Sequence, residues 1–405
     1  MAMKQSRSSQ GSVACRCRQS GFTMVELMVA IAVGLIVTLA VTGAVLTMGR
    51  QFRITGANAA AQGSAQIALS LMDEAGRSAG VGMYNNGQPL CPTLNAAYGG
   101  AVRSPGDVFL AAKIDDGGSN SASDTVTFTG SSAVGALSGT PVLEATTLNN
   151  PIKVSNAGSF QLNDLALIGA PGSGQPCTLF QVTAAPTTGA VCGGNASTCK
   201  TLTRATNATY NVFATPPSYG FSTSGTVYGP AVVNRLGSDF QQDRFAVMCG
   251  ALVKYNAFVN PSPTCTQYPL DFPGPNPAAP IAMDVVLMHA QYGISASAAS
   301  DVVTGWVNAN ATGWSSPTVA DAGRVKAVRV VVVTRSKEPD NTLVTAATCT
   351  NEAAVVNTGP CSFADAATPV IDLSATAVPA GRTWRNYRYR VHQAVIPLRN
   401  VIWSN

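Results

Sequence analysis

The sequence predicts an α+β protein in which one long N-terminal helix precedes a large, mostly antiparallel β-rich globular domain stapled by disulfides. Three observations predict this class. The apolar run Phe22–Met48 carries one formal charge, and no proline occurs between Phe22 and Gln88. Beyond Gly80, short β-prone segments alternate with loops rich in Gly, Pro, Ser and Asn. Eight of the ten cysteines lie in this later part of the chain.

The first 21 residues form a basic leader that contains no acidic residue. Positive residues beside an apolar span stay on the cytoplasmic side, so the rest of the chain is expected to face outward. The 27 residues from 22 to 48 suffice to cross a membrane and exceed the roughly 7–15 residues of a signal-peptide core. The basic residues of the leader are Lys4, Arg7, Arg16 and Arg18.

Glu26 is the charged residue near the start of this apolar run. A carboxylate at the edge of a membrane span is costly, which indicates a function. A buried carboxylate requires an opposite charge or a proton. The alternative is a side chain that reaches the membrane surface and remains in water.

The helix is expected to continue beyond the apolar run. Residues 49–80 form an amphipathic continuation, and Ile67, Leu71 and Glu74 are spaced as one helical face. Gly80 and Gly82 indicate where the helix stops. A helix from Phe22 to Arg77 would be about 85 Å long at ~1.5 Å per residue.

Residues 81–405 form the expected globular domain. Val330–Val333 is a continuous β-branched run typical of a central strand covered on both faces. Tyr387–Leu398 alternates as a half-buried strand does, whereas residues 192–199 and 261–280 are expected to be loops. The other expected strands are Asp107–Lys113, Asp124–Thr129, Asp164–Ile168, Thr178–Thr183, Arg244–Met248, Leu252–Tyr255, Ala282–Ile294 and Val325–Arg335.

The charge balance argues against a nucleic-acid partner. Four of the 25 basic residues lie in the leader, which leaves 21 against 20 acidic residues. Arg382, Arg385, Arg388 and Arg390 alternate with aromatic residues, which favours a half-exposed strand over a site for an acidic polymer.

No catalytic constellation stands out, so we expect no enzyme activity, no cofactor and no metal. His289 and His392 lie inside apolar strand patterns, and Gly169–Gly174 lacks the lysine of a phosphate-binding loop. The segment 115–124 is rich enough in oxygen ligands for calcium, but its spacing does not match an EF-hand and favours a hairpin loop.

The cysteines divide between the leader and the exported region. Cys15 and Cys17 belong to the leader, and an even number in an exported region implies disulfides. Eight cysteines allow 105 pairings. Short loops favour Cys192–Cys199, Cys249–Cys265 and Cys349–Cys361, which leaves Cys91 and Cys177.

The stretch Gly21-Phe22-Thr23-Met24-Val25-Glu26 resembles the signal of type IV prepilins and of type II secretion pseudopilins. The resemblance implies cleavage between Gly21 and Phe22 by a prepilin peptidase and methylation of Phe22. It also implies that Glu26, the fifth mature residue, pairs during subunit docking with the new amine of Phe22 on a neighbouring subunit.

Four later segments resemble PilW-type minor pilins. They are Ser123–Phe128, Val285–Gly293 with its Gln291-Tyr292-Gly293 end, Val325–Ser336 with Val328-Arg329-Val330, and Tyr387-Arg388-Tyr389-Arg390 closing on Leu398-Arg399-Asn400.

This resemblance implies a minor pilin that primes a type IV pilus, lies at or near its tip and supports adhesion and twitching motility. The expected partners are other minor pilins, the major pilin, the prepilin peptidase, the inner-membrane assembly platform and a tip adhesin. Before assembly the chain would cross the inner membrane once, with its domain in the periplasm. The alternatives are a J-type pseudopilin of a type II secretion system, and a bitopic envelope enzyme or binding protein.

Overall fold

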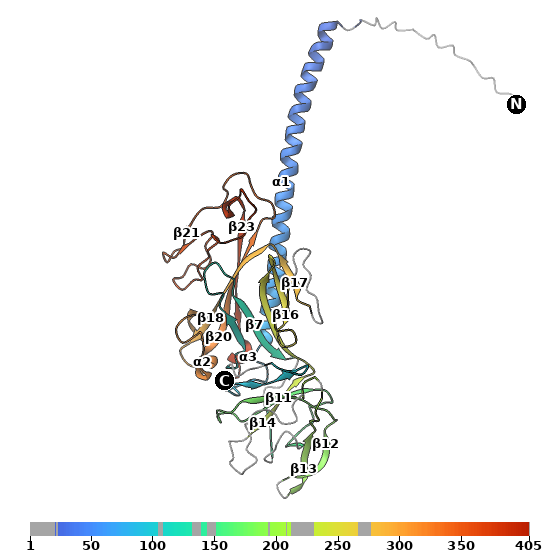
Figure 1. Ribbon diagram of the computed structural model, residues 1–405, viewed down its shortest axis with the longest axis vertical. Coiled ribbons are helices and arrows are strands. Elements are labelled where there is room, and N and C mark those ends of the chain that lie inside the picture. Colours follow the sequence, from blue (N-terminus) through green and yellow to red (C-terminus); the bar gives the residue numbers. More distant parts are fainter. Residues whose placement is uncertain are drawn as a thin grey trace, which may run out of the picture. The chain divides into compact units, whose positions relative to one another are not determined.

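The computed structural model describes residues 21, 23–103, 108–131, 139–143, 151–192, 195–207, 209–211, 231–265 and 277–404. These residues belong to two compact units, Met1–Gly56 and Ala57–Asn405. The long helix α1, Met24–Ser78, contributes to both units (Figure 1). The N-terminal helix and the mainly antiparallel β-domain confirm the predicted fold class.

Helix α1 ends where the sequence predicts. Gly80 has a φ of 81°, a left-handed conformation that glycine adopts without steric cost. The Asn400 side chain then donates to two carbonyls at the end of the helix, Arg77 O at 2.8 Å and Ala79 O at 3.0 Å. These bonds satisfy carbonyls that have no partner within a helix.

The buried face of α1 is not the one that carries Ile67, Leu71 and Glu74. Ile67 is 60 % exposed, whereas the buried positions are small or flexible residues spaced three and four apart. Gly76 approaches the domain so closely that a Cβ there would overlap Ile396. The face of α1 that packs against the domain therefore carries small residues, which allow the helix backbone to come close, and not the largest apolar side chains. Its buried residues are Ala65, Ala68, Met72, Ala75 and Ala79.

Two antiparallel sheets share the main core with α1. The first is five-stranded in the order β17-β16-β15-β7-β6, and the second is four-stranded in the order β19-β18-β20-β23. Val126, Met288, Val330 and Met72 lie together in this core. The first sheet comprises β6 (Ala112–Asp115), β7 (Thr125–Ser131), β15 (Phe240–Met248), β16 (Ala251–Asn256) and β17 (Ala279–Met283). The second comprises β18 (Val285–Ser295), β19 (Val303–Asn308), β20 (Val325–Arg335) and β23 (Tyr389–Pro397).

Two further sheets surround a second, smaller core that includes Ile152 and Phe180. Their orders are β3-β11-β10-β14-β8 and β12-β13-β9, and β3 and β11 are parallel. The strands are β3 (Leu94–Asn95), β8 (Thr140–Pro141), β9 (Ile152–Val154), β10 (Leu165–Gly169), β11 (Cys177–Gln181), β12 (Thr187–Cys192), β13 (Asn195–Leu202) and β14 (Val232–Gly237).

Three strand pairs and three short helices complete the described structure. The pairs are β1 (Tyr84–Asn85) with β2 (Gln88–Pro89), β4 (Ala97–Tyr98) with β5 (Ala101–Val102), and β21 (Cys349–Thr350) with β22 (Val356–Asn357). The helices are α2 (Val319–Arg324), the 3₁₀ helix η1 (Trp384–Asn386) and α3 (Arg399–Ile402).

Three sequence predictions for this domain need correction. The expected strand 282–294 is two strands in different sheets, because Asp284 breaks the run with a φ of 58°. The expected loop 192–199 is mostly strand, because Cys192 ends β12 and residues 195–199 belong to β13, which pairs with β12. The expected strand 107–113 begins only at Ala112, because the Ala111 amide donates to the Tyr84 hydroxyl and not to a neighbouring strand.

Candidate functional site

The N-terminal end of α1 holds Glu26 against Thr23. The Thr23 amide donates to Glu26 Oε2 at 3.1 Å, and the Thr23 hydroxyl donates to the same oxygen at 3.0 Å. The Glu26 amide donates back to Thr23 Oγ1 at 3.3 Å. This reciprocal arrangement is a capping box. Gly21 is exposed, and Phe22 lies outside the described residues, so cleavage and methylation stay predictions.

The first part of α1 presents an apolar surface that nothing in the chain covers within the described residues. The span Met24–Gly49 is 26 residues long, and it is apolar enough to cross a membrane. Leu39 is 72 % exposed and Leu46 is 71 % exposed. Such a surface requires a membrane or packed neighbouring helices.

Three predicted disulfides are present in the globular domain. Cys91 is bonded to Cys177, Cys249 to Cys265 and Cys349 to Cys361. Cys199 is also disulfide-bonded, but the side chain of Cys192 lies outside those described, so this fourth pairing stays a prediction. Cys15 and Cys17 also lie outside the described residues.

Two of the sequence motifs meet in the four-stranded sheet. Gln291 on β18 lies opposite Arg329 on β20, and the Arg329 Nε donates to Gln291 Oε1 at 2.6 Å. Arg329 is 1 % exposed in the middle of a valine-rich strand. It forms a two-pronged ion pair with Asp365, at 2.6 and 3.0 Å. The guanidinium lies 4.7 Å from the ring centroid of Trp306 and 4.6 Å from that of Phe363.

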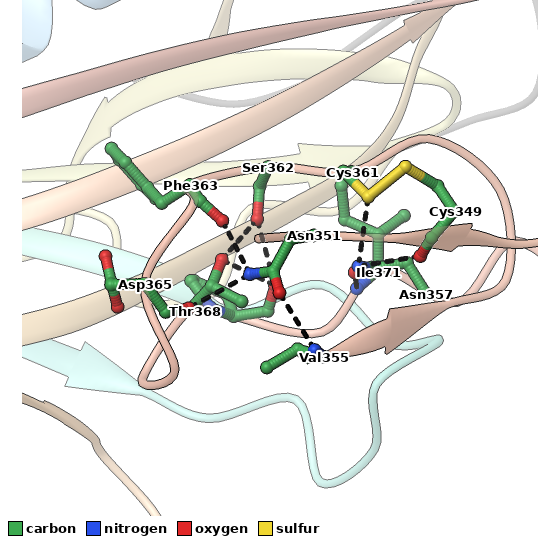
Figure 2. The surroundings of a disulfide bond; sticks show 11 residues. Cys349, Asn351, Val355, Asn357, Cys361, Ser362, Phe363, Asp365, Thr368 and Ile371 are labelled. Atoms are coloured by element: carbon green, nitrogen blue, oxygen red, sulfur yellow. Dashed lines mark hydrogen bonds between the residues drawn. A yellow bond between two sulfur atoms is a disulfide. The ribbon is translucent and has the colours of Figure 1, made fainter. Parts of the chain in front are cut away.

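Arg329 therefore anchors the segment that contains the Cys349–Cys361 disulfide. Figure 2 shows Asn351 at the centre of this segment, where its Nδ2 donates to the carbonyls of Phe363 and Asp365, both at 3.0 Å. The Val355 amide donates to Asn351 Oδ1 at 2.8 Å and closes the turn. The disulfide, Asn351 and Arg329 together hold this segment, residues 349–365, on the face of the sheet; it is called the excursion below.

Sequence reasoning did not single out Gln291, Arg329, Asp365 or Asn351 as a cluster. One signal was available, because a charged residue inside a buried β-branched run requires a partner. Asp365 is 36 residues further along the chain, and no periodicity connects it to Arg329.

His289 is buried in the sheet, as its apolar surroundings predict. Its Nδ1 lies 3.3 Å from Asp124 Oδ2, and its Nε2 lies 3.0 Å from the Asn120 carbonyl. Burial lowers the pKa of His289, but the hydrogen bond and charge of Asp124 and the Asn120 carbonyl together raise the pKa above its ordinary value. Both ring nitrogens face acceptors, which favours the imidazolium form.

The oxygen-rich loop does not gather its carboxylates. Asp115 pairs with Arg244 and Lys113, Asp116 accepts from the Gly118 amide, and Asp124 accepts from Ala290. No group of three acidic, histidine or cysteine side chains able to hold a metal occurs among the described residues.

The arginines of the cluster near the C-terminus bind other residues of the same domain. The Arg382 and Arg385 side chains donate to the carbonyls of Asp340 and Thr345, and Arg388 pairs with Asp340 at 3.0 Å. These arginines hold the loop that follows β20. The expected half-exposed strand is wrong for most of them, because Arg385 lies in η1 and only Arg390 lies in a strand, β23.

Comparison with known protein families identifies both ends of the chain. Residues 254–400 match the model of the Type IV Pilus-assembly protein W family. Residues 16–42 match the prokaryotic N-terminal methylation motif. The two matches together support a PilW-type pilin. The PilW match includes β18, β20, β23 and the excursion anchored by Arg329.

Comparison with solved structures finds a type IV-like pilin from Thermus thermophilus. The alignment is 14 % identical, covers 40 % of this chain and 70 % of that chain, and has a TM-score of 0.19. No curated protein matches the sequence significantly. The PilW-type assignment therefore rests on the two family matches, and the apolar helix with its methylation motif indicates membrane anchoring.

Proposed function

We propose that this PilW-type pilin is a minor pilin that primes assembly of a type IV pilus and lies at or near its tip. The observation that supports this most strongly is the combination of a PilW match over 254–400 with a methylation motif over 16–42. More than 300 residues follow α1, and a domain of this size would crowd a filament in which subunits repeat closely. The tip leaves one face of such a domain free.

The proposed life cycle begins in the inner membrane. The basic leader stays in the cytoplasm and the globular domain faces the periplasm. A prepilin peptidase cuts after Gly21, and Phe22 becomes the methylated N-terminus. The inner-membrane assembly platform then moves the chain out of the membrane. The chain joins other minor pilins, the major pilin and a tip adhesin. It acts as a structural protein and not as an enzyme.

Glu26 is the proposed docking charge. Its carboxylate is exposed and bonded only within the first turn of α1, to Thr23, among the described residues. Among packed apolar helices this carboxylate loses its contact with water, and an ion pair with the Phe22 amine of a neighbouring subunit offsets that loss.

Glu26→Ala should leave cleavage intact and reduce the amount of this protein in sheared pili. Glu352→Ala, which removes an exposed carboxylate from the tip of the β21–β22 turn, is the matched control. Equal incorporation of Glu26→Ala and wild type would reject the docking role.

The role at the tip is tested by counting subunits. Quantitative mass spectrometry of sheared pili should find far fewer copies of this protein than of the major pilin. Deletion should abolish piliation, and disabling retraction should partly restore it. Near-equal copy numbers would make the protein a shaft subunit and reject the tip assignment.

The J-type pseudopilin of a type II secretion system shares this architecture. It predicts a different phenotype, in which deletion stops secretion of exoproteins and leaves piliation unchanged. The PilW match favours the pilus.

A further inference from the structure

A cavity of about 220 Å³ lies against the outer face of the five-stranded sheet β17-β16-β15-β7-β6. The pilin role does not explain this cavity. Its floor is formed by β6, β7 and β15, whose alternate side chains point away from the main core. Apolar residues of the preceding segment, including Leu94 and Phe109, together with Pro261, form part of its wall. The cavity thus has a polar floor beneath a partly apolar cover.

The strand register places the polar residues of the cavity floor side by side. Lys113 and Arg244 lie directly opposite Thr127 on its two sides, and Gln242 lies opposite Thr129. Thr127 is 8 % exposed and Thr129 is 4 % exposed, so the cover shields these hydroxyl-bearing residues from bulk solvent. Polar side chains on the outer face of a sheet are usually solvated, whereas these two threonines are buried and the Lys113, Arg244 and Gln242 side chains are partly exposed.

The lining is electropositive. Among its described residues three are basic, Arg103, Lys113 and Arg244, and Asp115 is the one acid. Asp115 already pairs with both Arg244 and Lys113. The Lys113 side chain is 43 % exposed and that of Arg244 is 25 % exposed, so the recess is partly open to solvent. Its net positive charge raises the local concentration of anions.

Two guanidinium donors at this cavity have no acceptor among the described residues. They are Nε of Arg103 and Nε of Arg244, both buried. Arg103 makes a bond of 3.3 Å from Nη2 to the Val259 carbonyl, and Arg244 uses its Nη2 for Asp115 and Thr125. Buried charged donors that lack an acceptor are destabilising, and native proteins rarely keep them without a ligand or water nearby.

We propose that this cavity binds a small hydroxyl-bearing organic acid of the size of one acidic sugar. Guanidinium groups match a carboxylate in charge and in planar geometry, and the threonine and glutamine side chains suit hydroxyl groups. The volume is below the roughly 300–1,000 Å³ of pockets for drug-sized ligands, so one ring is accommodated. The site is independent of the pilin role, and its ligand is either a free sugar acid or the terminal unit of a surface polysaccharide.

Calorimetric titration of the full-length protein in detergent micelles tests the site. D-glucuronate should bind, and its affinity should fall as salt is added. D-glucose, which has the same hydroxyl-bearing ring without the carboxylate, should bind at least about tenfold more weakly, because the charge-assisted bonds are lost. An oligosaccharide ending in glucuronate distinguishes the two sources: binding indicates a polysaccharide end, and exclusion indicates the free acid.

Variants connect binding to the cavity. Arg103→Gln and the nearly isosteric Thr127→Val should each weaken glucuronate binding, the first by about tenfold or more. Arg388→Gln removes the same charge from a surface ion pair outside the cavity and should bind as wild type does. Thermal melts of each variant check folding, and Thr127→Val remains informative if Arg103→Gln does not fold.

Three outcomes would overturn the proposal. They are no glucuronate binding at millimolar concentration, equal affinity for glucose, and unchanged binding in both cavity variants. Sulfate that binds as tightly as glucuronate would overturn the assignment to a sugar acid.

Discussion

Among single residues, two of the arginine–aspartate pairs in the domain differ strongly in burial. The Arg329 side chain is 2 % exposed in its pair with Asp365, whereas the Arg388 side chain is 48 % exposed in its pair with Asp340. Arg329 holds the pKa of the Asp365 carboxyl below its usual range. The buried guanidinium cannot turn to water when its partner is removed, but the exposed one can.

These two pairs predict unequal costs of removing the acid. Asp365→Ala should lower the free energy of unfolding by about 2 kcal/mol, below the ~3–5 kcal/mol of a fully buried broken pair because Asp365 is itself half-exposed. Asp340→Ala should cost about 0–1 kcal/mol. Chemical denaturation of both variants provides the comparison. Equal losses would show that Arg329 does not depend on Asp365.

His289 predicts a pH dependence of stability. Its pKa is raised in the folded protein, so its contribution is complete below the ordinary value near 6.5 and is lost as pH rises through the folded pKa. His392 has the opposite sign, because burial and Arg390 lower its pKa and stability is lost as pH falls.

Melting temperatures measured between about pH 5 and pH 9 span both titrations. In His289→Gln the melting temperature should no longer fall toward alkaline pH. In His392→Gln it should no longer fall toward acid pH. An unchanged alkaline slope in His289→Gln would contradict the imidazolium assignment.

At the scale of elements, the contact between α1 and the domain depends on glycine. A Cβ on Gly76 would overlap Ile396 on β23 and lie 3.3 Å from Phe128, whereas a Cβ on Gly63 would meet nothing within 4 Å. Both glycines lie in the same helix. The sequence suggests a role for its glycines but does not distinguish these two, because the distinction depends on the partner strand.

Substitution by alanine should therefore have opposite effects at the two positions. Gly63→Ala should stabilise the isolated protein by up to about 1 kcal/mol through helix propensity. Gly76→Ala should destabilise it despite the same propensity, because the new Cβ would overlap the Cγ2 methyl group of Ile396. Ile396→Leu should relieve part of the loss, because leucine lacks this branch at Cβ. Thermal melts of the four variants, with the double variant as the fourth, decide this. Stabilisation by Gly76→Ala would show that the contact is not tight.

At the scale of the whole molecule, local patterns predicted a large part of the architecture. The stop of α1 at Gly80, the central strand around Val330 and three disulfides follow from glycine chemistry, β-branched runs and cysteine spacing. Strands such as Ile152–Val154 and Val303–Asn308 were missed because they are short or only partly buried. The Arg329–Asp365 pair and the cavity of Arg103 and Arg244 were not predictable, since their members are brought together only by tertiary contacts.

Processing as a pilin would leave its mark at the N-terminus of the mature chain. Intact-mass measurement and N-terminal fragmentation of the protein isolated from membranes should show a chain that begins with methylated Phe22. Gly21→Ser should retain the leader, while Ser20→Ala should be processed as wild type is. A mature chain that begins at Met1, or after Ala59, would show that the protein is not processed as a pilin.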